Sequence, residues 1–177
     1  MRPHVELIDE KDLIFHPSEL VGGIGEAKQR NLAYDEEDGS LSAKIHFDSD
    51  WRRPAGVHVA QTEWYVLEGE VKIGDEVLHK GSYWMTPAGV VAPALEVKAG
   101  TQILYFREFG DWRFEATDQP WDSVRPDQKL IIKRSEEMDW IDVSTAARCA
   151  STWAAPRCRA CTSRCCFATR RPASTPA

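Results

Sequence analysis

Hydrophobic and polar residues alternate along residues 27–110 in a way that predicts short β-strands. Runs of about five to eight residues rich in Val, Ile, Tyr, Trp and Thr are bounded there by Gly, Asp or Pro. The segments KIHFD and EVKIGDEVL alternate strongly enough to place one face on a core and the other in water. Gly74 and Asp75, between two apolar strands, predict a hairpin turn. This close, regular spacing favours an all-β fold, an antiparallel sandwich or barrel.

The segments on either side of this region follow other patterns. Residues 1–26 predict one or two entry strands, HVELI and KDLIF, and a glycine-rich loop at VGGIG. Residues 111–144 are polar, aromatic and interrupted by proline, which favours an edge strand or a linker. Residues 145–177 contain no acid and no Lys, Ile, Leu, Val or Tyr, so we expect an irregular, disordered tail. The chain is therefore expected to divide into 1–26, 27–110, 111–144 and 145–177.

The tail also holds every cysteine of the chain, namely Cys149, Cys158, Cys161, Cys165 and Cys166. Three interpretations stay open. Their spacing fits a thiolate site for zinc or an iron-sulfur cluster. The segment can equally be a disordered basic arm. It can also be the out-of-frame translation of GC-rich DNA, in which case the natural protein continues past Ser144.

Composition narrows the class of protein. A length of 177 residues, 42% of them hydrophobic and 28% charged, is typical of a single globular domain. All acids lie at or before Asp142, where 28 of them face 16 basic residues, so residues 1–142 carry about −12. That charge argues against nucleic acid as a partner. No apolar run approaches the roughly 20 residues of a membrane span, and the acidic N-terminus is unlike a secretory signal, so we expect a cytoplasmic protein with no membrane partner.

Two blocks carry the candidate chemistry, GVHVAQTEWYVLEGEVKIG and GSYWMTPAGVVAPALEV. They resemble the first and second motifs of the cupins, which implies a single jelly-roll β-barrel. In metal-binding cupins the first motif supplies two histidines and a glutamate, and the second motif supplies a third histidine. Counting from Gly69 and Pro87, the four corresponding positions here are Gly56, His58, Thr62 and Ala92.

Only His58 of these four can ligate a metal, and one imidazole cannot hold a divalent cation against water. We therefore expect no metal and no cofactor. Small residues at the other three positions predict a widened, mostly apolar pocket for a small organic molecule. The residues expected to contact this ligand are Gly56, Thr62, Trp64, Val66, Tyr83, Met85 and Ala92. Plain core packing is the alternative for Trp64 and Tyr83.

His58 and Glu63 are the candidate catalytic residues. An imidazole is well suited to proton transfer near neutral pH. Glu63 adjoins the glutamate position, and a β-bulge would turn it into the barrel. Strict alternation would instead turn Glu63 to the opposite face, as a surface or interface carboxylate.

A longer stretch, AKQRNLAYDEEDGSLSAKIHFDSDW followed by PAGVHVAQTEWYVLEGEV, is similar to the ChrR-like cupins. This group includes acetylacetone-dioxygenase-type enzymes, and the resemblance spans about residues 20–110. Their iron ligands are the His-x-His pair, sometimes the glutamate, and the second-motif histidine, of which only His58 matches. The stretch MDWIDVS resembles the start of a second barrel, which implies that this chain is the first barrel of a truncated bicupin.

Several functions fit these observations. The chain can be a metal-independent isomerase, lyase or cyclase that uses His58 on a small organic substrate. It can be a metal-dependent dioxygenase with atypical ligands, or a non-catalytic binding or sensor module. Because cupins pair through sheet edges and faces, we also expect a homodimer.

Overall fold

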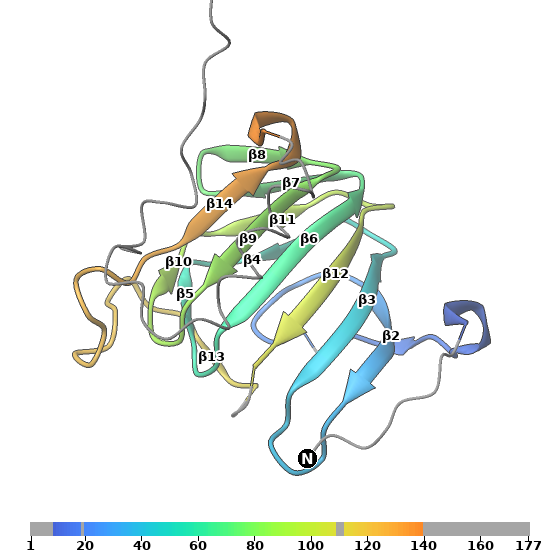
Figure 1. The fold of residues 1–177 in the computed structure, drawn as a ribbon, viewed down its shortest axis with the longest axis horizontal. Helices are drawn as coiled ribbons and strands as arrows, with labels where there is room; N and C mark the ends of the chain where they lie inside the picture. Colours follow the sequence, from blue (N-terminus) through green and yellow to red (C-terminus); the bar gives the residue numbers. More distant parts are fainter. Residues whose placement is uncertain (1–8, 19, 109–111, 140–177) are drawn as a thin grey trace, which may run out of the picture. The chain divides into compact units, whose positions relative to one another are not determined.

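The longest strands of the protein pair into one antiparallel sheet. The computed structural model describes residues 9–18, 20–108 and 112–139. Within these residues the order of the large sheet is β1-β2-β3-β12-β6-β9-β14, and its central strands lie side by side in Figure 1. Its strands are β1 (His16–Pro17), β2 (Ala27–Tyr34), β3 (Leu41–Phe47), β6 (Thr62–Glu68), β9 (Ser82–Thr86), β12 (Gln102–Arg107) and β14 (Ile131–Arg134).

Two smaller sheets accompany the large one. One has the order β4-β11-β7-β8, and the other has the order β10-β5-β13. Their strands are β4 (Trp51–Arg53), β5 (Gly56–His58), β7 (Glu70–Ile73), β8 (Glu76–His79), β10 (Val91–Ala92), β11 (Leu95–Val97) and β13 (Phe114–Glu115). Two 3₁₀ turns, η1 (Glu10–Asp12) and η2 (Ser135–Glu137), complete the described elements. The all-β prediction is confirmed, and none of the helices found here is long or apolar enough to span a bilayer.

The chain divides into two units, Met1–Met138 and Asp139–Ala177. The fold and the site discussed below belong to the first unit. Asp139 is the one described residue of the second, so every interpretation of the tail at 145–177 lies outside the described residues. The predicted strand HVELI and the end of MDWIDVS lie outside them as well.

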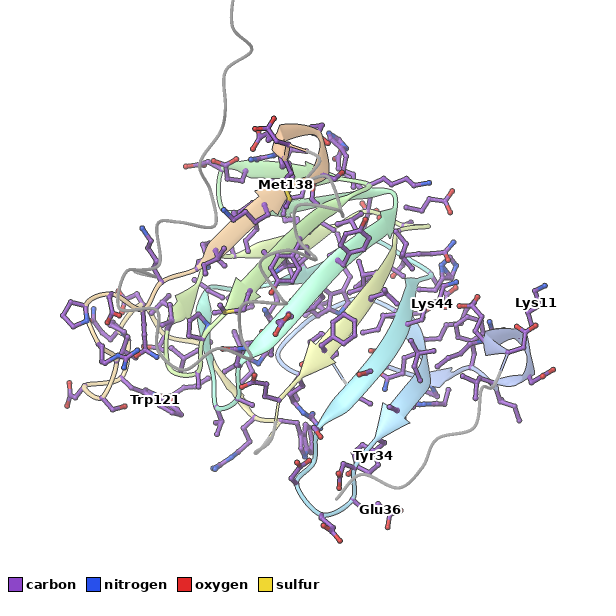
Figure 2. All side chains as sticks on the ribbon, in the orientation of Figure 1. Lys11, Tyr34, Glu36, Lys44, Trp121 and Met138 are labelled. Atoms are coloured by element: carbon purple, nitrogen blue, oxygen red, sulfur yellow. The ribbon has the colours of Figure 1, made fainter. Side chains whose placement is uncertain are left out.

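Alternation along the strands builds the core. In β3, Leu41, Ala43, Ile45 and Phe47 are buried, and the residues between them are partly exposed. The same period places Trp64 of β6 opposite Trp84 of β9, where the two indoles stack at 5.1 Å between ring centroids. Such aromatic pairs contribute about 0.5–1.5 kcal/mol beyond the burial of their area. Side chains fill the space between the sheets in Figure 2.

The N-terminal segment differs from its prediction. KDLIF does not form a strand, because Glu10–Asp12 forms the turn η1 and the first strand begins at His16. The Asp9 carboxylate accepts a hydrogen bond from the Lys11 amide at 3.0 Å, which favours a turn over an extended chain. Glu10 of this turn forms an ion pair with Lys44 of β3, at 2.7 Å between Nζ and Oε1. Figure 2 labels Lys44.

The predicted hairpin forms, and the two segments that supply β5 and β13 each contribute strands to two sheets. The hairpin at Gly74 and Asp75 is confirmed, since Ile73 pairs with Glu76 across it and Gly74 has a φ of 60°. The stretch VHVAQTEWYVLEG forms two strands, β5 and β6, in different sheets. Segment 111–144 contributes β13 beside β5 and β14 beside β9.

Candidate functional site

The four positions that match cupin metal ligands lie in buried parts of neighbouring strands. Gly56 and His58 belong to β5, and Ala92 of β10 pairs directly with Gly56. Thr62 begins β6 and is 1% exposed. The register expected from the two motifs is thus the register of the fold.

Phe114 fills the space beside Gly56. A Cβ atom added to Gly56 would lie 2.4 Å from Phe114 Cζ and 2.3 Å from the carbonyl oxygen of Glu115. Strand pairing causes this, because Phe114 of β13 pairs with His58 and their rings lie 5.1 Å apart. The place of the first cupin histidine is therefore taken by an aromatic ring from a segment more than fifty residues further along the chain.

The cavity beside His58 is small. Its volume is about 10 Å³, enough for about one water molecule. It is lined by Leu20, Val21, Gln29, Leu41, His58, Tyr105, Arg107 and Trp112. The expectation that the missing ligands leave a widened pocket is wrong for this structure, since Phe114 takes up the space. A ligand of several atoms can enter only if one of the lining side chains moves.

Two arginines give the interior its charge. Arg53 is 4% exposed and Arg107 is 7% exposed, and neither forms an ion pair with any described carboxylate. The Arg53 guanidinium lies over the Phe114 ring, at 4.6 Å from Cζ to the ring centroid. Burial lowers the pKa of Arg53 to about 10, so it still carries its charge at neutral pH.

Arg107 adjoins the predicted ligand position at Thr62, because the two residues pair across β12 and β6. Its Nε and Nη2 donate to the carbonyl oxygen of Gly39, at 3.3 Å and 2.7 Å. The Thr62 hydroxyl, which is buried, has no hydrogen-bond partner among the described residues. A cationic residue thus pairs with the residue at the position of the cupin glutamate.

His58 is held neutral by these surroundings. Burial is the main cause that lowers its pKa to about 3, and the positive charges of Arg53 and Arg107 contribute to the same shift. The Nε2 atom of His58 is buried and has no hydrogen-bond partner in the part of the chain that the structure describes. At neutral pH His58 can act as a hydrogen-bonding group, and it becomes a useful base only if a ligand raises its pKa.

These residues do not fit a divalent metal ion. His58 is the one ligating side chain at the four positions, and no group of three or more His, Cys, Asp or Glu side chains in the described ranges could hold a metal. Arg53 and Arg107 would also repel a cation beside His58. We therefore derive no step that involves a metal.

The other predicted site residues fall on two faces. Trp64 and Val66 are fully buried in the core. Arg53 Cζ lies over the Trp64 ring, 5.7 Å from the ring centroid. Glu63, Tyr83 and Met85 lie on the opposite face of the large sheet.

On that face Glu63 pairs with Met85 and accepts a hydrogen bond from the Tyr83 hydroxyl at 2.7 Å. Glu63, Tyr83 and Met85 therefore do not share a cavity with His58, which corrects the expectation that all the predicted residues line one pocket. The reason is strict two-residue alternation without a bulge at Glu63. Burial and the bonded carboxylate raise the pKa of Tyr83.

Sequence reasoning missed three residues of the interior, Arg53, Arg107 and Phe114. A signal existed for the arginines, because Arg53 follows Trp51, and Arg107 follows Tyr105, at the two-residue spacing of a buried face. Phe114 gave no such signal, since its role depends on long-range pairing with β5.

A larger groove, of about 870 Å³, lies along β4 and β11. None of the nine predicted site residues lines it, whereas exposed residues such as Arg52 and Glu96 do. Arg53 lines this groove and also contacts Phe114, so it lies between the groove and the barrel interior.

Comparison with known proteins identifies the family. Residues 6–156 match the model of a domain of unknown function, DUF4437. The chain belongs to this family. No curated protein matches the sequence of this DUF4437 chain.

Solved structures with the same fold are cupins. A candidate dioxygenase from Nostoc punctiforme matches with a TM-score of 0.67 at 20% identity, over 76% of this chain and 50% of its own. A candidate acetylacetone dioxygenase from Methylibium petroleiphilum matches with a TM-score of 0.53 at 18% identity, over 74% and 88%. The polyketide cyclase RemF from Streptomyces resistomycificus matches with a TM-score of 0.52 at 17% identity, over 66% and 90%.

At these identities the similarity establishes the fold alone, and the predicted cupin fold of the DUF4437 chain is confirmed. The chain spans half the length of the Nostoc protein.

Proposed function

We propose that this DUF4437 cupin binds a small organic molecule beside His58 and works without a metal ion. The support is the set of groups around that imidazole. The matching ligand positions hold Gly56, Thr62 and Ala92, none of which ligates strongly, and the Phe114 ring occupies the space beside Gly56. What is left for a ligand is a neutral imidazole, a hydroxyl and fixed positive charge, which suit an organic molecule better than a cation.

His58 is the group we assign to chemistry on this molecule. A metal-independent isomerase, lyase or cyclase needs one positioned acid or base, which contributes about a hundred- to ten-thousandfold in rate. The same fold serves the polyketide cyclase RemF. A ligand that brings negative charge near His58 would raise the pKa of His58 toward neutrality and so make it an effective base.

A second candidate is non-catalytic binding, and one observation favours it. The pKa of His58 is about 3, which makes its imidazole a weak base in the free protein. A sensor or carrier needs only the hydrogen-bonding capacity of His58 and not its basicity. The catalytic and the non-catalytic hypotheses differ in whether the bound ligand is converted. Product formation must therefore be measured as well as affinity.

Metal analysis of the purified protein tests the proposal. We expect iron, manganese, nickel and zinc each far below one ion per chain, even after incubation with the metal salts. Near-stoichiometric metal that is lost in His58→Leu, with His79→Asn as the matched exposed control, would refute the proposal. That result would favour the dioxygenase alternative with atypical ligands.

The expected oligomeric state and cellular location stay predictions. A homodimer is testable by sedimentation velocity, in which a mass of twice 20.0 kDa is expected. A cytoplasmic location is testable by fractionation of cells that express the natural gene.

A further inference from the structure

The interior of this barrel carries positive charge without a buried negative partner. The buried ionisable side chains in the described ranges are Arg53, His58, Tyr105 and Arg107, and no Asp or Glu is among them. Residues 1–142 carry about −12 in total, so this cationic interior does not follow from composition. A buried charge without a partner is costly, and in a native protein it calls for an explanation such as a bound ion of opposite sign.

The surroundings of Arg53 hold its guanidinium in place and leave its donors free. Its Cζ atom lies 4.6 Å from the centroid of Phe114, 5.7 Å from that of Trp64 and 5.8 Å from that of Trp51. Contacts over the ring faces stabilise the cation. They do not satisfy the N–H groups, which donate in the guanidinium plane, and the buried Nε and Nη1 have no partner among the described residues.

Arg107 is a second positive charge that, like Arg53, acts on His58. Two of its nitrogens bind Gly39, and the side chain lines the small cavity together with His58 and Tyr105. Two buried polar atoms nearby, His58 Nε2 and Thr62 Oγ1, have no partner in the described chain. His58 and Thr62 occupy two of the four positions that match cupin metal ligands, and Arg107 pairs with Thr62 across β12 and β6.

We propose that the barrel interior binds the carboxylate group of a small organic acid, with Arg53 and Arg107 supplying the opposing charge. The inference names the ligand class for the same site as the proposed function and rests on it. A carboxylate accepts two parallel hydrogen bonds from a guanidinium and donates none, which matches unpartnered donors. The cavity of about 10 Å³ holds one water molecule, so a carboxylate can enter only when one of the lining side chains moves.

Small probes test the ligand class directly. The full chain is titrated with sodium acetate and sodium malonate, with acetamide and malonamide as neutral matches, and with sodium phosphate and sodium chloride at equal ionic strength. The melting temperature and the ring ¹⁵N chemical shifts of His58 are followed. We expect the two carboxylates alone to give saturable increases in melting temperature and in the pKa of His58.

Three substitutions locate the charge. We expect Arg53→Met and Arg107→Met each to weaken acetate binding about ten- to hundredfold, the size of a lost charged hydrogen bond. Arg52→Met is the matched control, because Arg52 is exposed on the same strand and its loss changes the net charge equally. It should leave acetate binding unchanged.

The variants also have a signature in the absence of ligand. Arg53 and Arg107 are the charged groups that act on His58, and Tyr105 is the other titratable group on its cavity. Arg53→Met and Arg107→Met should therefore each raise the pKa of His58, whereas Arg52→Met should not. This measurement reports charge near His58 even if stability changes.

The outcomes separate the inference from the proposed function. A response to acetate that chloride reproduces overturns the inference. A response that survives in both Arg53→Met and Arg107→Met overturns it as well. So does saturable binding of phosphate without carboxylate. If acetamide perturbs His58 and acetate does not, the carboxylate class is wrong while small-molecule binding stands. Stoichiometric metal at His58 would instead overturn the proposed function itself.

Discussion

Acid should destabilise this protein through His58. In the folded protein the pKa of His58 is about 3, because burial and the charges of Arg53 and Arg107 disfavour the imidazolium. In the unfolded chain His58 has its ordinary pKa of about 6.5. Below pH 6.5 the unfolded state therefore binds a proton that the folded state does not. Stability is full above that pH and is lost progressively as the pH falls toward 3.

The size of the effect follows from the difference between the two pKa values. Each pH unit between them costs about 1.4 kcal/mol of unfolding free energy. Integrated from pH 7 to pH 5, the loss due to His58 is about 2 kcal/mol. Domains of this kind are stable by about 5–15 kcal/mol, so the loss is a large fraction of the total. With a urea slope of about 2 kcal/mol/M, it lowers the unfolding midpoint by about 1 M.

Urea unfolding at pH 7, 6 and 5 measures the loss of unfolding free energy, with His58→Leu as the test variant. Leucine fills a similar volume without titrating, and little hydrogen bonding is lost because Nε2 has no partner among the described residues. The variant should lose about 2 kcal/mol less than the wild type between pH 7 and pH 5. His79→Asn, at an exposed position of β8, should keep the wild-type dependence. Equal pH dependence of the wild type and His58→Leu would refute the reasoning.

Two further substitutions test the packing of the site and its separation from the outer face. Gly56→Ala should lower the unfolding free energy by about 1–3 kcal/mol in urea, because its Cβ meets Phe114 and the Glu115 carbonyl, and an unchanged midpoint would contradict the filled site. Tyr83→Phe should cost about 0.5–1.5 kcal/mol through the lost hydrogen bond to Glu63 and leave the response to acetate unchanged. An altered acetate response in Tyr83→Phe would show that the two faces communicate.

The strands were predictable because their pattern is local. Two-residue alternation in β3 and β6 and the turn residues Gly74 and Asp75 determine which side chains face the core. The register of the two cupin motifs was also readable from Gly69 and Pro87, and Ala92 does lie opposite Gly56.

The content of the site was less predictable, because it depends on pairing between distant segments. Phe114 comes from a short strand beyond the main barrel segment, and nothing near it in the sequence indicates that it packs on Gly56. The small residues Gly56, Thr62 and Ala92 by themselves therefore predict open space that the structure does not have. Glu63 shows the opposite case, since the alternation rule alone placed it on the outer face, beside Tyr83.

The arginines lie between these cases. Arg53 and Arg107 occupy positions that the strand period assigns to the core, but charged residues are rarely buried without a partner. A charge at a core-facing position is therefore itself a signal. This signal is weak in a single strand, and it is stronger for Arg107, which pairs with Thr62 at the position that matches the cupin glutamate.

The buried arginines bear on whether a metal ion could lie beside His58. A divalent cation and a guanidinium cannot both be stable beside His58, because each raises the cost of the other's charge. An ion in a barrel attracts anionic ligands, and fixed guanidinium groups can supply the same attraction without coordination chemistry. On our proposal the barrel interior binds carboxylates through the two arginines, without a metal ion. The consequence is that the arginines and His58 have different roles, binding for the arginines and catalysis for His58. Replacing Arg53 should weaken acetate binding more than replacing His58 does, whereas any turnover should depend mainly on His58.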